Sequence, residues 1–240
     1  MRLVQVYNSS LWRPYHWRKQ CISERLPDLS LLHGSCALRE RPMGTGPFLD
    51  SDANEFYAFH GQSVSAIDTI KDAGLCQEAA SPTSLFGGGV YLSCSAFRAN
   101  MAVPCARCGC GSIGRAPCTC AWLAQSQALE QQPEQALLIA RVTLGDAHIC
   151  ESYDASVYRG PTERPRRCPP LNPETGHRHD SIVGESAANG GPCLFREIVV
   201  FDRFQCYPEF VVHYKRVTAP EPPTSTPLLV AEAPVSDTHR

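Results

Sequence analysis

A single glutamate stands next to a stretch of sequence in which a charged side chain is unexpected. Ile198 to Phe201 is an unbroken β-branched and aromatic run, which predicts a strand buried on both faces. Glu197 directly precedes this run, so its carboxylate must be paired, point into a polar cleft, be protonated or turn to solvent. His60 and Tyr91 are further polar side chains at the end or edge of a predicted strand. These three residues are the first candidates for chemistry.

Cysteine is the second residue type whose spacing indicates chemistry. The chain has 13 cysteines, and five crowd into one short loop: Cys105, Cys108, Cys110, Cys118 and Cys120. Cys105-x-x-Cys108 is typical of half a zinc site, whereas Cys118-x-Cys120 is a looser second half, with Cys110 as a replacement ligand. Four thiolates would form a structural site without an open position for water. The alternative is a set of free thiols in a Gly-rich loop.

The elements that must position these residues are short strands separated by a few helices. The expected helices cover residues 11–22, 64–73, 96–103 and 121–130. The expected strands cover residues 2–7, 56–59, 90–92, 136–144, 148–150, 180–184, 195–201 and 209–214. Strands near the carboxyl end are joined too closely for helical crossovers, which favours an α+β fold with antiparallel sheets. No G-x-G-x-x-G loop stands between a strand and a helix, which argues against a Rossmann enzyme.

Composition limits the classes of partner. A hydrophobic content of 43% is enough for a core, and a net charge of -2 argues against nucleic-acid binding by bulk electrostatics. No long apolar run predicts a membrane span. The amino terminus lacks the pattern of a signal peptide, so we expect an intracellular protein, cytoplasmic or nuclear, with reduced thiols. Proline and threonine from residue 218 onward predict a disordered tail over 218–240, after one domain over 1–217.

The segment from Tyr158 to His179 is rich in proline and arginine and shows no periodicity. It is expected to be an ordered surface loop. Its arginines at 159, 164, 166 and 167 are interpreted as solvated side chains, and binding of phosphate or of an acidic acceptor is the less favoured interpretation.

Several motifs, in their order and spacing, resemble the catalytic domain of the poly(ADP-ribose) polymerase family, most closely its tankyrase branch. The resemblance runs from about Val4 to Val217. The segments that carry it are 11–18, 54–61, 86–91, 140–145, 176–184, 195–202 and 207–210. Each segment is weak alone, and the ordered set is specific. The resemblance implies a diphtheria-toxin-like ADP-ribosyltransferase fold of two packed, mostly antiparallel sheets with flanking helices. Tankyrases carry a small zinc site where the cysteine loop lies.

The resemblance also assigns roles to residues. The family's His, Tyr and Glu triad falls on His60, Tyr91 and Glu197. His60 would orient NAD through a ribose hydroxyl, Tyr91 would lie against the nicotinamide ring, and Gly61 would offer its backbone to the carboxamide. Glu197 would bind the nicotinamide-ribose 2′-hydroxyl, stabilise positive charge on that ribose and serve as general base. Gly89 is also expected to contact NAD, which is a consumed substrate.

Two family side chains are missing. Counting from Tyr91 without gaps, Ala99 and Ala102 stand where the family usually has a serine and a ring-stacking tyrosine. Each loss would weaken nicotinamide binding by about 1 kcal/mol. Phe97 or Met101 would substitute if the helix is shifted.

The expected activity is that of a glycosyltransferase of the pentosyltransferase class. It would move ADP-ribose from NAD to protein side chains or to a growing poly(ADP-ribose) chain and release nicotinamide. Protein acceptors are the expected partners, and nucleic acid and membranes are not. A glutamate at position 197 permits chain elongation, and mono-ADP-ribosylation stays open. The alternatives are a weak or inactive module that binds NAD or ADP-ribose, and a zinc-stapled interaction domain without an NAD site.

Overall fold

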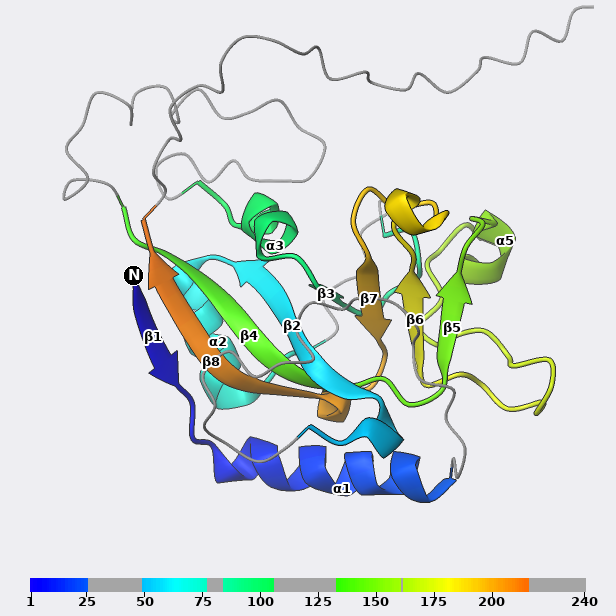
Figure 1. The fold of residues 1–240 in the computed structure, drawn as a ribbon, viewed down its shortest axis with the longest axis horizontal. Helices are drawn as coiled ribbons and strands as arrows, with labels where there is room; N and C mark the ends of the chain where they lie inside the picture. The colour runs from blue at the N-terminus through cyan, green and yellow to red at the C-terminus, as the bar shows by residue number, and fades with distance from the viewer. Residues whose placement is uncertain (26–48, 77–83, 106–132, 161, 216–240) are drawn as a thin grey trace, which may run out of the picture.

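The computed structural model describes residues 1–25, 49–76, 84–105, 133–160 and 162–215 (Figure 1). The helices are α1 (Ser9–Arg25), α2 (Val64–Ala73), α3 (Ala96–Ala102) and α5 (Ala155–Tyr158). The strands are β1 (Arg2–Gln5), β2 (Glu55–Gln62), β3 (Val90–Ser93), β4 (Gln135–Thr143), β5 (Ala147–Cys150), β6 (Ser181–Gly184), β7 (Glu197–Val200) and β8 (Cys206–Tyr214). Within these ranges, short 3-10 helices form at η1 (Ser51–Ala53), η3 (Ala187–Asn189) and η4 (Arg203–Gln205).

The strands form one mixed sheet in the order β1-β8-β4-β2-β3-β7-β6-β5. Every neighbouring pair is antiparallel except β5 and β6. The α+β class and the antiparallel character are therefore confirmed. The expectation of two separate packed sheets is wrong for the described residues, because the strands form one sheet. The half β1-β8-β4-β2, called here the long-strand half, is joined to the half β3-β7-β6-β5, the short-strand half, through the pair Phe59↔Ser93 (Figure 1).

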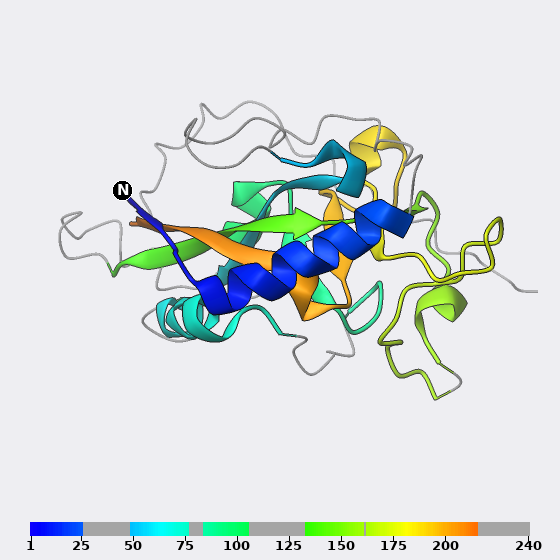
Figure 2. The same ribbon diagram turned by 90° about the horizontal axis from the view of Figure 1, so that it is seen from below.

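Helix α1 is held against the sheet by its buried face. Figure 2 shows the helix lying across β8 in the view from below. The side-chain oxygen of Asn8 accepts hydrogen bonds from the N–H groups of Ser10 and Leu11 and so caps the helix start. Tyr15 and Ile22, seven residues apart and therefore on the same side of the helix, are both fully buried. The Tyr15 hydroxyl donates to Glu55 Oε1 at 2.6 Å.

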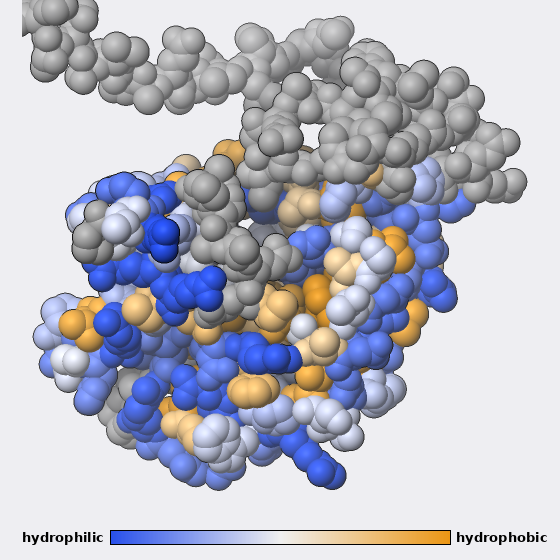
Figure 3. Space-filling view, turned by 180° about the vertical axis from the view of Figure 1, so that it is seen from behind, coloured by the Kyte–Doolittle hydropathy of each residue, from blue (hydrophilic) through white to orange (hydrophobic). Residues whose placement is uncertain are grey.

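The largest core cluster fills the space between the sheet and α2. It includes Ala58 of β2, Leu138 of β4, Val200 of β7 and Ile67 of α2, all nearly inaccessible to solvent. Helix α2 has the predicted bounds, and Gly74 ends it with φ 80°, a conformation that favours glycine. On the face shown in Figure 3, hydrophobic residues gather near the centre of the described surface among hydrophilic ones.

A buried arginine links the central strands. Arg141 of β4 has no solvent exposure. Its Nε donates to Glu209 Oε2 of β8 at 2.7 Å, and its Nη2 donates to the Tyr57 hydroxyl of β2 at 2.9 Å. Its Nη1 lies 3.3 Å from Glu55 Oε2. A charge so deeply buried is tolerated because carboxylates and a hydroxyl surround it.

The carboxyl end of β2 bears on the site. β2 extends to Gln62, beyond the predicted end at Phe59, because its ladder with β4 continues through Gly61↔Leu137 and Gln62↔Ala136. His60 and Gly61 thus lie inside a strand.

The predicted helix 121–130 and the predicted tail 218–240 lie outside the described residues. Among the helices of the described ranges, none has the length and apolar character needed to cross a bilayer.

Candidate functional site

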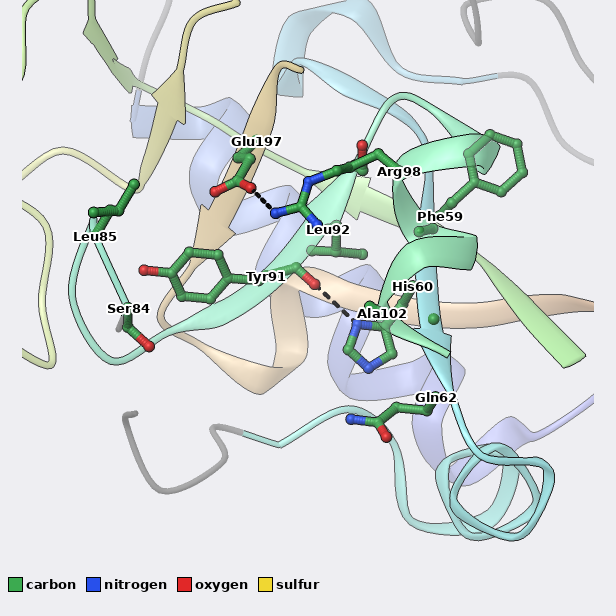
Figure 4. A pocket seen from close by; sticks show the side chains of 13 residues that line it. Phe59, His60, Gln62, Ser84, Leu85, Tyr91, Leu92, Arg98, Ala102 and Glu197 are labelled. Carbon is green, nitrogen blue, oxygen red and sulfur yellow. Dashed lines mark hydrogen bonds and ion pairs between the residues drawn. The ribbon is translucent and has the colours of Figure 1, made fainter. Parts of the chain in front are cut away.

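A cavity of about 350 Å³ lies where the two halves of the sheet meet (Figure 4). Four residues predicted from the sequence line it: His60, Gly61, Tyr91 and Glu197. They come from β2, β3 and β7, which are far apart in the chain and adjacent in the sheet. The cavity also includes Ser84 and Leu85 of the preceding loop, Arg98, Ala99 and Ala102 of α3, and Phe59, Gln62, Leu92 and Ser93 of β2 and β3. Its volume falls at the lower end of the range for small-ligand sites.

The ring of His60 is fixed by a hydrogen bond between strands. Its Nδ1 lies 2.9 Å from the backbone oxygen of Tyr91. A carbonyl only accepts hydrogen bonds, so Nδ1 must carry the proton. In the neutral ring, Nε2 is then the acceptor nitrogen, suited to a hydroxyl donor. The bond also links β2 to β3 near their single paired position.

Tyr91 is placed to act through its ring. Its hydroxyl donates to the Gly87 carbonyl at 2.8 Å and accepts from the Phe86 N–H at 2.9 Å. Burial raises the pKa of Tyr91, so the hydroxyl stays neutral in the physiological range. Since the phenolic oxygen is already engaged, the ring surface is what the residue offers to a flat ligand in the cavity.

Glu197 is the first residue of β7, paired with Ser93 of β3 and Gly184 of β6. Its side chain is 15% exposed and forms an ion pair with Arg98 Nη2 through Oε1. The sequence left open whether this carboxylate is paired, points into a cleft, is protonated or turns to solvent. In the structure it is paired with Arg98 and also lines the cavity. It does not face bulk solvent.

Arg98 is the residue that the sequence analysis missed. It lies on α3, whose start is capped by Ser95, and its side chain is 14% exposed. Figure 4 shows its guanidinium pointing from α3 toward the Glu197 carboxylate. The available signal was the helical segment expected at 96–103, in which Arg98 directly precedes Ala99. A cation on a helix beside a predicted cleft is a natural partner for a half-buried carboxylate.

A second ion pair fixes the start of β7. Arg196 donates to Glu185 from Nε at 3.0 Å and also from Nη2, and both residues are buried. Burial alone would raise the pKa of Glu185. The hydrogen bonds from Arg196 and from the Ser186 backbone N–H outweigh burial and hold that pKa at about 2. The pair anchors the residue before Glu197 and so helps to orient the carboxylate toward the cavity.

Gly61 has a packing role that is independent of any ligand. A Cβ atom at this position would lie 1.9 Å from the Ala99 carbonyl oxygen, so α3 packs directly on the glycine backbone. Gly89 lies outside the cavity lining. A Cβ there would meet Val199 Cγ1 at 2.5 Å, because β7 packs closely against it. Contact of Gly89 with NAD stays a prediction.

Helix α3 presents Ala99 and Ala102 to the cavity. Phe97 and Met101 are 65% and 39% exposed and are not part of the lining. The Phe97 ring instead lies against Phe195, with centroids 6.0 Å apart. The predicted substitution for the missing stacking face is therefore not found.

Of the cysteines predicted to bind zinc, only Cys105 lies within the described residues. Cys105 is half-buried, and Cys108, Cys110, Cys118 and Cys120 lie outside the described residues. Within the ranges that the structure describes, no group of three or more His, Cys, Asp or Glu side chains is placed to hold a metal ion. Structural zinc stays a prediction.

No protein-family model matches this chain.

Proposed function

We propose that the chain is an ADP-ribosyltransferase of diphtheria-toxin-like fold, which uses NAD as a consumed substrate and protein side chains or a growing poly(ADP-ribose) chain as acceptors. One observation supports this proposal most directly. His60, Tyr91 and Glu197, the three residues predicted from the sequence motifs, line the same cavity together with Gly61.

The chemistry of these groups suits cleavage of a glycosidic bond. A flat nicotinamide would lie against the Tyr91 ring, and a ribose hydroxyl would donate to His60 Nε2. The bond between ribose C1′ and the nicotinamide nitrogen breaks, and nicotinamide leaves with the electron pair. Glu197 stabilises the positive charge on the ribose, because a fixed carboxylate in a partly enclosed site acts strongly on developing charge.

The acceptor completes the reaction. Its oxygen forms a new bond to C1′, and its proton passes to the Glu197 carboxylate, which returns it to solvent. Arg98 already binds Oε1 of that carboxylate. The second oxygen, Oε2, is the atom that would accept from the ribose 2′-hydroxyl. Arg98 therefore orients Glu197 and also offsets part of its charge.

A second candidate function is a module that binds NAD or ADP-ribose with little or no turnover. Two observations favour it. Ala99 and Ala102 line the cavity without a hydroxyl or an aromatic ring, and Arg98 holds Glu197 in an ion pair. Weaker nicotinamide binding and a partly neutralised carboxylate would both lower catalysis more than they lower binding of the adenosine half.

Labelled NAD separates the candidates. Wild-type protein should incorporate label from adenine-labelled NAD, and Glu197→Gln should reduce incorporation by about 10²- to 10³-fold. The variant should still show thermal stabilisation by NAD. Glu174→Gln changes an exposed glutamate that does not line the cavity, so it is the matched control and should keep full incorporation.

Two outcomes would contradict the enzymatic proposal. Stabilisation by NAD without any incorporation identifies the binding module. If NAD causes no stabilisation and no label is incorporated, the chain has no NAD site, and the interaction domain is the remaining candidate.

A further inference from the structure

A second cavity, of about 310 Å³, lies at the opposite end of β7 from Glu197. Phe201 and Asp202, which directly follow β7, line it. Four residue steps separate Phe201 from Glu197, which amounts to about 13 Å along an extended strand. The second cavity is therefore distinct from the NAD cavity proposed above, and the inference below does not depend on that proposed function.

Cationic side chains dominate the lining of this cavity. Arg18 and Arg25 come from α1, and Arg167 and Arg178 come from the long segment between α5 and β6. Two carboxylates, Asp180 and Asp202, stand against these four guanidinium groups, and His177 and His179 add further nitrogen atoms. The lining therefore carries an excess of about two positive charges when both histidines are neutral.

The carboxylates hold two of the arginines in place. Asp180, whose side chain is only 2% exposed, forms an ion pair with Arg25 and lies 3.5 Å from Arg18 Nη2. Arg18 Nε lies 3.0 Å from Asp202 Oδ2. These contacts engage part of each guanidinium group, which has donors on several sides. Because these ion pairs hold Arg18 and Arg25 in place, a ligand in the cavity would not have to order two long side chains.

The loop arginines divide into two groups. Arg166 Nε donates to the Arg159 carbonyl at 2.9 Å, and Arg159 Nη1 donates to the Glu163 carbonyl at 3.0 Å, so both hold the loop together. Arg167 is exposed and lines the cavity. Arg178 Nη1 donates to the Pro169 carbonyl at 2.9 Å, and both residues line the cavity. The loop arginines are therefore not simply solvated side chains, because Arg159 and Arg166 bond to the loop backbone and Arg167 lines the cavity.

We propose that this cavity binds a pyrophosphate-bearing small anion, such as a nucleoside diphosphate. Planar guanidinium groups match phosphate oxygens with paired hydrogen bonds, and the net positive charge of the lining favours a ligand with several negative charges, such as a pyrophosphate group. The volume suits a ligand of nucleotide size at the small end of such sites. Phe201, a half-buried lining residue of this cavity, gives an apolar surface for a sugar or base.

The test measures binding of inorganic pyrophosphate and of ADP to the full chain, by calorimetry at constant ionic strength. The variant is Arg167→Ala, because this side chain is exposed and its loss should leave the fold intact. The matched control is Arg164→Ala, an exposed arginine of the same loop that does not line the cavity. His60→Ala separates this cavity from the one at the junction of the sheet halves.

Wild type, Arg164→Ala and His60→Ala should bind both probes, and Arg167→Ala should raise Kd about tenfold. Tighter binding of ADP than of pyrophosphate assigns the ligand to nucleotides, and equal binding assigns it to the pyrophosphate group alone. Three results would overturn the proposal: no binding to wild type, equal loss in Arg164→Ala and Arg167→Ala, or loss in His60→Ala with full binding in Arg167→Ala.

Discussion

At the scale of single residues, the main feature is the ion pair between Arg98 and Glu197. Each side chain is mostly shielded from water, with 14% and 15% exposure. Removing one partner of such a pair leaves the other charge with little solvation. The pair therefore does two things. It makes a carboxylate tolerable beside a buried strand, and it sets the direction in which that carboxylate points.

This pair predicts a measurable coupling between the two positions. Arg98→Ala should lower the free energy of unfolding by about 1–3 kcal/mol in the wild-type background, since Glu197 loses its cation. In the Glu197→Gln background the same change should cost clearly less. A double-mutant cycle from urea unfolding gives the coupling directly. Coupling below about 0.5 kcal/mol would mean that solvent replaces Arg98 at no cost.

Gly61 supports a second prediction. Gly61→Ala should lower the free energy of unfolding by about 1–3 kcal/mol, because the new methyl group meets the Ala99 backbone oxygen and α3 has to move. Gly160→Ala is the matched control, since its Cβ would meet nothing nearer than the Arg164 oxygen at 3.7 Å. Circular dichroism melts of both variants test this, and equal melting temperatures would exclude close packing of α3 on Gly61.

Sequence reasoning found one side of this residue-level picture. Glu197 stands out because an acid next to an apolar run is locally anomalous, and the resemblance of the ordered motifs predicts its role as a site residue. Its partner Arg98 could not be predicted in the same way, because an arginine on a short helix is ordinary. The contact joins positions 99 residues apart, so it appears only after β3 and β7 have paired.

At the scale of elements, the start of β7 is set by the Arg196–Glu185 pair. Arg196 stands one residue before Glu197, and Glu185 stands one residue after the end of β6. The two residues therefore tie neighbouring strands together at the end where the cavity lies. The order of strands and helices could largely be predicted from periodicity, as for α2 and its terminal Gly74. The join of β2 to β3 could not be predicted, because Phe59↔Ser93 is a single long-range pair.

The Arg196–Glu185 pair predicts a dependence of stability on pH. The folded-state pKa of Glu185 is about 2, below its ordinary value of 4.5. The stabilisation from ionised Glu185 is therefore complete above pH 4.5 and is lost as pH falls toward 2. Glu185→Gln should be less stable than wild type at neutral pH, and the difference should shrink as pH falls through this window.

Urea unfolding at pH 6, 4 and 3, which extends about 1.5 units to each side of the ordinary carboxyl pKa, measures this difference. Glu174→Gln is the control for loss of one exposed carboxylate, and its difference from wild type should stay small throughout. A Glu185→Gln difference that is constant with pH would mean that the carboxyl titrates alike in folded and unfolded chains.

At the scale of the whole molecule, the proposed NAD cavity belongs to both halves of the sheet. His60 and Gly61 come from the long-strand half, and Tyr91 and Glu197 come from the short-strand half. The site therefore requires both halves to fold and to keep their register. Motif spacing could place each residue on a strand, but only the assembled sheet could bring them into one cavity.

The long-strand half depends on the buried Arg141 network for this register. Arg141→Met keeps the volume roughly constant but leaves the Glu55 and Glu209 carboxylates buried without their main cation. We expect a loss of about 3–5 kcal/mol in the free energy of unfolding. This is a large share of the roughly 5–15 kcal/mol typical of a domain, so the variant should unfold at markedly lower urea concentration.

Arg2→Met removes the same charge from an exposed pair with Glu134, 63% and 49% accessible, and should change stability by less than about 1 kcal/mol. Similar urea midpoints for the two variants would mean that the buried network contributes no more than a surface contact. The cavity exists only while β2 and β3 remain paired. In Arg141→Met, with its lower urea midpoint, binding of NAD should therefore be lost at the urea concentration at which the sheet unfolds and not before. Loss of binding ahead of that transition would show instead that the junction opens on its own, with the two halves acting as separate cooperative units.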